Sequence, residues 1–124
     1  MLEDSILIVD DDESIRNMFA SFFGNTGYKV YVAESAEEAI PVMEKVYCHL
    51  VFIDIELPGM NGIDLCKTIR KENSTSVLTA ITGFGPIYNK DECKASGFNY
   101  YFKKPIRLEK LLKLAKHVFE EKPL

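Results

Sequence analysis

Five side chains that could act together in one reaction stand at or just after the ends of short apolar runs. They are Asp10, Asp11, Asp54, Thr82 and Lys104. Three carboxylates gathered in a small crevice repel one another, and such repulsion shifts their pKa values. A hard divalent cation relieves the repulsion, and Mg²⁺ prefers carboxylate, carbonyl and water oxygens as ligands. If the fold brings the three aspartates together, the sequence therefore predicts a magnesium site.

The same set of residues could accept a phosphoryl group. With Mg²⁺ and the Lys104 ammonium beside it, the Asp54 carboxylate can attack a phosphoryl group, because both cations offset the charge on the phosphoryl oxygens. The Thr82 hydroxyl could donate a hydrogen bond to one of those oxygens. We therefore interpret Asp54 as a candidate phosphoacceptor and Lys104 and Thr82 as its supporting groups.

Taken singly, each of these residues also has an ordinary structural explanation. Asp11 or Asp12 could cap the helix that follows, since aspartate is a favoured N-cap residue. Asp54 could start the turn at Pro58-Gly59. Thr82 could be a β-branched strand residue, Lys104 a solvated lysine, and Tyr101 part of the core. The joint placement favours chemistry, because four separate strand ends each supply a residue type that one reaction requires.

Five apolar segments predict the strands that would position these groups. Residues 50–54 form a continuous apolar run that ends in an aspartate and precedes a turn, which is typical of a strand buried on both faces. The other predicted strands are 5–9, 28–33, 77–82 and 100–102. The strands alternate with helical patterns, which predicts an α/β domain with one parallel sheet, right-handed crossovers and helices on both faces. Parallel strands place their carboxyl ends on one edge, where such sheets bind ligands.

The first two predicted helices have clear start and stop signals. One apolar stripe at helical spacing marks the first helix: Ile15, Met18, Phe19, Phe22 and Phe23. Gly24 or Gly27 should end it. Ser35 and Glu38 form a capping box for the second helix, which should run to about Val46. Pro41 inside this helix removes a backbone donor and should kink or shorten it.

The remaining three helices differ in strength. The third should span 62–71, with Ile63, Leu65, Cys66 and Ile69 on its buried side. The fourth, at 87–96, has few apolar anchors and is the weakest, and Gly97 should stop it. The last, at 107–120, carries an apolar stripe: Leu108, Leu111, Leu112, Ala115, Val118 and Phe119.

Composition excludes several classes of protein. With 124 residues, the chain is expected to form one domain, spanning residues 1–124. It has no apolar run long enough to cross a bilayer, and its acidic N-terminus does not resemble a secretory signal. The three cysteines are odd in number and lack CxxC spacing, so we expect reduced, buried thiols and a cytoplasmic location. A net charge of −4 argues against direct nucleic-acid binding through a broad basic face.

Four sequence segments resemble the receiver domains of two-component response regulators, the family of the chemotaxis protein CheY. ILIVDDDESIR is similar to the family's first strand with its acidic pair, and LVFIDIELPGMNG to its phosphoacceptor strand and the following loop. LTAITG and YYFKKPI resemble the ends of the fourth and fifth strands. The resemblance covers essentially the whole chain. Gly83 differs from the family's usual alanine, and Lys104 is assigned in place of Lys103 because it abuts Pro105.

The resemblance implies a flavodoxin-like, doubly wound sheet of five strands in the order 2-1-3-4-5, with five helices. It implies that a histidine kinase or phosphotransfer protein phosphorylates Asp54. Asp11 would bind Mg²⁺ directly, Asp10 mainly through water, and the Glu56 backbone carbonyl would complete the protein ligands. Lys104 would pair with the phosphoryl group and Thr82 would hydrogen-bond it.

The family also implies a switch. Tyr101 matches an aromatic position that turns inward when the threonine moves, and the surface of the fourth helix, fifth strand and fifth helix then changes its preference for an output partner. Such a domain catalyses only its own phosphotransfer and dephosphorylation.

Other functions remain open from the residues alone. The chain could be a receiver-like interaction module with an inert site, although the intact set of site residues argues against this. A flavin-binding electron carrier of the same fold would need a phosphate cradle after the first strand, where four consecutive acids would instead repel phosphate. An aspartate phosphatase would need a second aspartate at position 56, which is glutamate.

Overall fold

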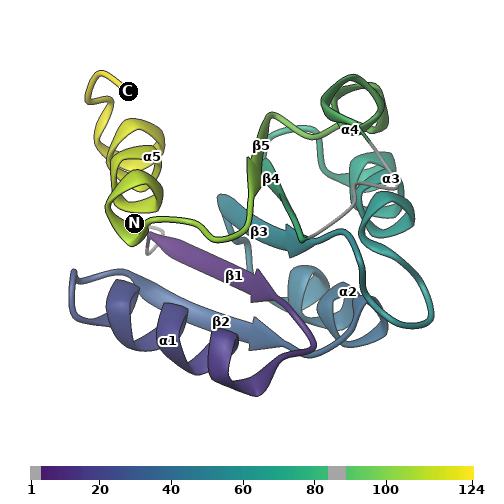
Figure 1. The fold of residues 1–124 in the computed structure, drawn as a ribbon, viewed down its shortest axis with the longest axis horizontal. Coiled ribbons are helices and arrows are strands. Elements are labelled where there is room, and N and C mark those ends of the chain that lie inside the picture. Colours follow the sequence, from purple (N-terminus) through teal and green to yellow (C-terminus); the bar gives the residue numbers. More distant parts are fainter. Residues whose placement is uncertain (1–3, 84–88) are drawn as a thin grey trace.

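A five-stranded parallel sheet forms the centre of the structure, a computed structural model that describes residues 4–83 and 89–124 (Figure 1). The strands are β1 (Ser5–Val9), β2 (Lys29–Ala33), β3 (Leu50–Asp54), β4 (Val77–Thr82) and β5 (Tyr100–Lys103). All pairs are parallel and the spatial order is β2-β1-β3-β4-β5. Both the strand positions and the predicted order 2-1-3-4-5 are confirmed.

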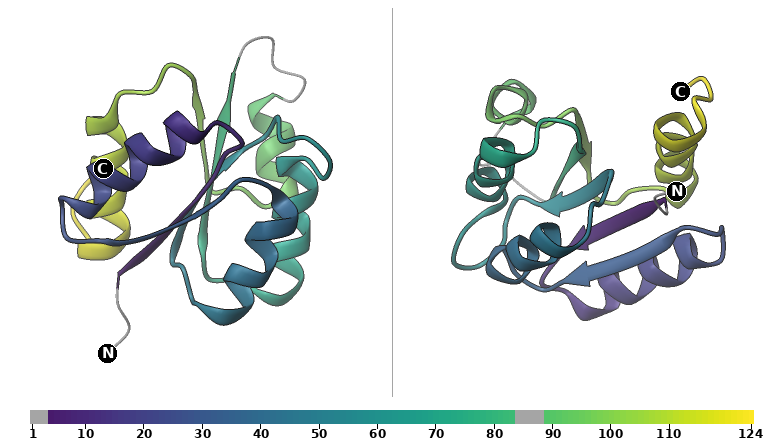
Figure 2. Two further views of the ribbon diagram at one scale, coloured as in Figure 1. Left: turned by 90° about the horizontal axis from the view of Figure 1, so that it is seen from below. Right: turned by 180° about the vertical axis from the view of Figure 1, so that it is seen from behind.

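Helices cover both faces of this sheet. They are α1 (Glu13–Gly24), α2 (Ala36–Lys45), α3 (Gly62–Glu72), α4 (Lys90–Ser96) and α5 (Leu108–Glu120). Figure 2 shows α1 and α5 on one face and α2, α3 and α4 on the other. No helix in the described part of the chain is both long and apolar enough to span a bilayer.

The central strands separate two apolar cores. Every residue of β1 and β3 is buried. Leu7 and Val9 pack with side chains of α2, α3 and α4, while Ile6 and Ile8 pack with side chains of α1 and α5. Alternate residues of a strand point to opposite faces, so a continuous apolar run supplies both cores. This burial makes the centre of the sheet a rigid base for the residues at its carboxyl edge.

The α1 face is held by stacked and edge-on aromatic rings. The Phe23 ring stacks on Phe52 of β3 with centroids 5.6 Å apart, and Phe19 meets Phe52 edge-on at 6.2 Å. The predicted stripe was too wide, because Met18 is 43% exposed. In α5, Leu114 is fully buried although the predicted stripe omitted it. Wide apolar stripes thus located the helices but not every buried position.

Caps explain where the helices begin. Asp12 is the N-cap of α1: its Oδ1 accepts hydrogen bonds from the backbone N–H and the hydroxyl of Ser14, at 2.9 and 2.6 Å. Ser35 caps α2, as predicted, but the Glu38 carboxylate accepts from the Glu34 N–H at 2.9 Å. The α2 helix continues past Pro41 to Lys45, so the expected shortening at the proline is wrong.

The fourth helix is the shortest of the five, with 7 residues and Cys93 as its buried residue. Asn89 and Glu92 form a capping box, and Gly97 ends the helix in the left-handed region with φ of 119°. The predicted start at residue 87 lies outside the described residues. A short helix with one buried side chain has little apolar area to hold it against the sheet.

Candidate functional site

The carboxyl edge of the sheet positions Asp54 by a close backbone contact. Asp54 is the last residue of β3 and is 6% exposed. After it the chain folds back, and the Gly62 N–H donates to the Ile55 carbonyl at 2.9 Å. A Cβ at position 62 would lie 2.6 Å from the Asp54 carbonyl oxygen, so only glycine fits. The first residue of α3 therefore packs directly against the backbone at the end of β3 and fixes its position.

Three carboxylates meet at this edge. Asp10 and Asp11 follow β1, and ligand oxygens of Asp10, Asp11 and Asp54 all lie within 4.8 Å of one another. Asp10 is buried and Asp11 is exposed, so the cluster opens to solvent on one side. Hard oxygen donors of this kind suit Mg²⁺, and the predicted gathering of the three aspartates is confirmed.

Lys104 lies beside two of these acids. Its Nζ is 3.3 Å from Asp10 Oδ2 and 3.4 Å from Asp54 Oδ2. The Lys104 backbone N–H donates to the Thr82 carbonyl at 2.7 Å, which continues the pairing of β4 and β5 up to the lysine. Burial alone lowers the Lys104 pKa, but the charges of Asp10 and Asp54 outweigh it, and the net shift is upward. The lysine is therefore fixed as a cation at neutral pH.

The environment of Asp54 disfavours the ionised form of its carboxylate. Burial raises its pKa, and the negative charge of Asp10 raises it further. A hydrogen bond of 2.9 Å from the Glu56 N–H and the Lys104 ammonium oppose this shift without cancelling it. An added cation would relieve the remaining cost of the charge.

Thr82 ends β4 with its side chain almost fully buried, at 2% exposure. Its hydroxyl donates to Glu56 Oε1 at 3.4 Å, and the Gly83 N–H donates to the same oxygen at 3.2 Å. The sequence had assigned only the backbone carbonyl of Glu56, and that role remains a prediction. Nothing in the sequence indicated where this exposed loop carboxylate would point.

Arg16 of α1 also reaches the site and was missed by the sequence analysis. Its Nη1 donates to the Asp10 carbonyl at 2.9 Å, and its Nη2 lies 3.8 Å from the Glu34 carboxylate. The side chain holds the backbone of the residue that carries the buried acid. An arginine one turn into a helix gives no sequence signal of such a contact.

Tyr101 lies in β5 beside Ala80 of β4 and is partly buried against the core that contains Cys93. Burial raises the pKa of its hydroxyl. The position fits an aromatic ring that could repack between β4 and α4. Its role in a switch remains a prediction.

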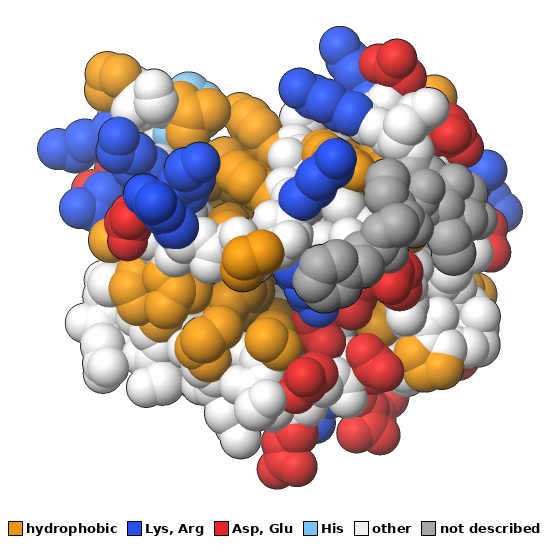
Figure 3. Space-filling view, viewed as in Figure 1, with side chains coloured by type: hydrophobic (Ala, Val, Ile, Leu, Met, Phe, Trp, Pro, Cys, Tyr) orange, Lys and Arg blue, Asp and Glu red, His pale blue; other side chains and the backbone are white. Residues whose placement is uncertain are grey.

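Charge is unevenly distributed over the surface. In Figure 3, acidic side chains gather over the ends of β1 and β2, and lysines gather over α5.

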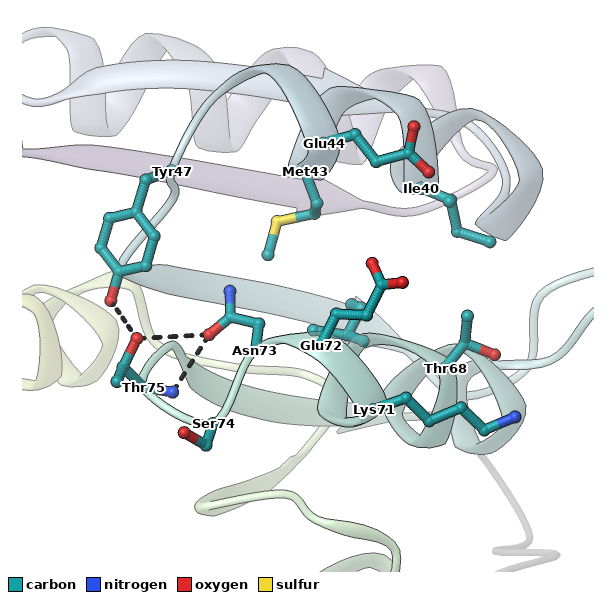
Figure 4. Close-up of a pocket in the computed structure, with 11 residues that line it drawn as sticks. Ile40, Met43, Glu44, Tyr47, Thr68, Lys71, Glu72, Asn73, Ser74 and Thr75 are labelled. Carbon is teal, nitrogen blue, oxygen red and sulfur yellow. Dashed lines mark hydrogen bonds between the residues drawn. The ribbon is translucent and has the colours of Figure 1, made fainter.

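A groove of about 640 Å³ lies elsewhere, between α2 and α3 (Figure 4). Three of its polar residues bind one another: the Tyr47 hydroxyl and Thr75 Oγ1 lie 2.9 Å apart, and the Thr75 N–H donates to Asn73 Oδ1. None of the predicted site residues lines this groove.

Comparison with known families agrees with this geometry. Residues 6–116 match the response regulator receiver domain. The chain belongs to this family. Receiver domains of two-component response regulators carry a phosphoacceptor, so the class of function predicted from the sequence is confirmed.

Relatives of this receiver domain occur both in short and in multidomain proteins. Sporulation initiation phosphotransferase F of Bacillus subtilis is 29% identical over 111 residues, which is 90% of each protein. A cyclic di-GMP phosphodiesterase of Thermotoga maritima is 31% identical over 107 residues, which is 86% of this chain and 28% of that protein. The chain likewise spans 47% of the two-component response regulator PhoP of Pseudomonas aeruginosa, which is 31% identical.

Solved structures show the same fold. The chemotaxis protein CheY4 of Vibrio cholerae superposes on the receiver domain with a TM-score of 0.86 and 28% identity, over 94% of this chain and 99% of that one. The flavodoxin-like, CheY-like architecture is thereby confirmed.

Proposed function

We propose that Asp54 is the phosphoacceptor of this receiver domain and that residues 1–124 form one phosphorylation-dependent switch. The observation that carries the proposal is the joint placement of its carboxylate. One oxygen faces the Lys104 ammonium at 3.4 Å, and the cluster formed with Asp10 and Asp11 lies beside it. A cytoplasmic location belongs to the proposal and is supported by three free, buried cysteines.

The acidic cluster would hold Mg²⁺. Asp11 would bind it directly, Asp10 mainly through water, and Asp54 and the Glu56 backbone carbonyl would contribute the other protein ligands. When bound, the ion supplies positive charge that offsets the charge of the phosphoryl oxygens. The donor set fits this role, because all its ligands are oxygens and Asp11 faces solvent, from which an ion can enter.

The protein side of the transfer follows from the contacts of Asp54. A carboxylate oxygen of Asp54 attacks the phosphorus of a phosphohistidine, a new O–P bond forms and the N–P bond breaks, leaving the imidazole on the donor protein. Lys104 lies close enough to neutralise the developing charge, and Thr82 can donate to a phosphoryl oxygen. The donor is a histidine kinase or phosphotransfer protein, and the domain catalyses only its own phosphotransfer and dephosphorylation.

Phosphorylation would then be read out on the α4-β5-α5 surface. Thr82 moves toward the phosphoryl group, Tyr101 repacks, and the surface changes its preference for an output partner or domain. A coupling of about 1–3 kcal/mol between the two sites is the usual scale of such effects.

Acetyl phosphate tests the assignment. With Mg²⁺ and acetyl phosphate, the protein should gain the mass of one phosphoryl group, and Asp54→Asn should gain none while keeping its circular dichroism spectrum. Asp64→Asn, on the exposed start of α3, is the matched control and should still be labelled. Labelling of the Asp54→Asn variant would refute the acceptor. Absence of labelling in the wild type would favour the inert interaction module.

A further inference from the structure

We infer that the Glu56 carboxylate competes with the phosphoryl group, because it already accepts hydrogen bonds from the Thr82 hydroxyl and the Gly83 N–H at the end of β4, which a phosphoryl group on Asp54 would also attract. This inference rests on the proposed function, since it concerns the same Asp54 site. It adds a defined role for one side chain that lies two residues beyond the acceptor.

The geometry of the contact is specific. A single oxygen, Glu56 Oε1, accepts from the Thr82 hydroxyl at 3.4 Å and from the Gly83 N–H at 3.2 Å. A Cβ at position 83 would lie 3.5 and 3.6 Å from the two carboxylate oxygens, so the whole group lies against the open face of Gly83. The two donors therefore converge on one point, and an anion stands at that point.

The same loop joins this anion to the acceptor. The Glu56 N–H donates to Asp54 Oδ1 at 2.9 Å, so the backbone of Glu56 supports the acceptor while its side chain extends to the end of β4. A phosphoryl group on Asp54 carries oxygens of the same charge as the glutamate. Both anions cannot share the Thr82 and Gly83 donors, since each N–H or O–H has one proton to donate and like charges at close range repel.

The contact therefore favours the unphosphorylated arrangement of the β4 end. Glu56 is exposed, so its carboxylate can leave for water at small cost. The competition should accordingly be modest in size. Phosphorylation must displace the Glu56 carboxylate before Thr82 can move. Loss of the Glu56 contacts is therefore a small free-energy cost that opposes the response of Thr82 to phosphorylation of Asp54.

Beryllofluoride, a stable analogue of the phosphoryl group, tests the competition by binding and not by turnover. With saturating Mg²⁺, we expect Glu56→Ala to bind beryllofluoride roughly threefold to tenfold more tightly than the wild type, as measured by ¹⁹F NMR titration. Glu56→Gln should fall between the two, because its amide oxygen still accepts hydrogen bonds but carries no charge. In the absence of Mg²⁺ and fluoride, the Gly83 amide resonance should shift in both variants.

A matched control removes an equal charge elsewhere. Glu44→Gln, on the exposed side of α2, should bind beryllofluoride as the wild type does. Equal or weaker binding by Glu56→Ala, with wild-type and Glu44→Gln binding unchanged, would overturn the inference and leave the proposed function intact. Failure of the wild type itself to bind the analogue would overturn the proposed function and this inference with it.

Discussion

At the scale of single residues, the negative charge of Asp54 is energetically unfavourable before any cation binds. Asp54 is buried next to Asp10, and both effects raise its pKa above the unfolded value of 3.8. Lys104 compensates only in part. The proposed acceptor therefore lies in an environment that disfavours its ionised form, which is a frequent property of functional sites.

This imbalance predicts that Asp54→Asn stabilises the Mg²⁺-free protein. The amide lacks the charge that burial opposes, so the free energy of unfolding at pH 7 should rise by roughly 0.5–2 kcal/mol. Because the folded pKa is raised, the folded protein binds more protons than the unfolded chain between the two pKa values. The wild type therefore loses stability as pH rises through the folded pKa of Asp54.

Urea unfolding of both proteins across pH 3.5–7 would measure this effect as a difference. The advantage of the variant should be small at the acid end, where most of the aspartate is protonated in both states, and should grow toward neutral pH. An advantage that does not change with pH, or a variant less stable than the wild type at pH 7, would contradict the assigned cause.

At the scale of elements, the side chain of Arg70 holds the C-terminal end of α4. Arg70 of α3 donates to the Gly97 carbonyl at 2.9 Å, to the Ser76 carbonyl at 2.7 Å and to Asn99 Oδ1 at 2.6 Å. Asn99 in turn accepts from the Leu78 N–H at 2.8 Å. One guanidinium thus connects α3, the start of β4 and the turn between α4 and β5.

Gly97→Ala should disrupt the contact between Arg70 and the C-terminal end of α4. A Cβ at position 97 would lie 2.8 Å from Arg70 Cγ, and the φ of 119° is unfavourable for alanine. We expect a loss of about 1–3 kcal/mol in the free energy of unfolding and faster amide exchange in α4. Gly24→Ala is the control, because a Cβ there meets nothing within 4 Å, and it should change stability by less than about 0.5 kcal/mol. Equal losses in free energy of unfolding for the two variants would contradict this prediction, because the close approach of Arg70 to Gly97 would then make no measurable contribution to stability.

The elements were predicted from sequence more reliably than their details. Apolar runs located the central strands, because a strand buried on both faces is mostly apolar, although Ser5 of β1 and Asp54 of β3 are buried polar residues. The exposure of Met18 and the burial of Leu114 could not be predicted from the apolar pattern. The width of an apolar stripe does not show how a helix is rotated about its axis relative to the sheet. The α2 helix accommodates Pro41 because surrounding packing can override a local helix breaker.

At the scale of the whole molecule, Mg²⁺ should stabilise the fold, because only the folded chain brings the three aspartates together. At a tenfold excess of Mg²⁺ over its dissociation constant, the gain is about 1.4 kcal/mol. Asp11→Asn should abolish this gain and leave Mg²⁺-free stability nearly unchanged, because Asp11 is exposed. Thermal unfolding with and without MgCl₂ measures both quantities.

Asp64→Asn should keep the full response to Mg²⁺ and serves as the control for charge removal. An Asp11→Asn variant that responds like the wild type would place the ion outside the acidic cluster.

The site as a whole was predictable because topology, more than local sequence, assembles it. Once the strands are parallel, the groups after β1, β3, β4 and β5 must share one edge. Side chains that reach this edge from less regular positions were not predictable: the Glu56 carboxylate extends from a loop, and the Arg16 guanidinium from a helix. Their contacts depend on rotamers, and no spacing rule encodes those.

The three cysteines make this domain convenient for labelling experiments. Burial raises the pKa of Cys48 and Cys66 to about 11 and also raises that of Cys93, so almost no thiolate exists at neutral pH. All three thiols are buried and should not react with maleimide reagents in the folded protein. A single cysteine engineered on the solvent side of α4 could then carry a fluorophore without removal of the native thiols, and the motion of that helix could be followed in real time.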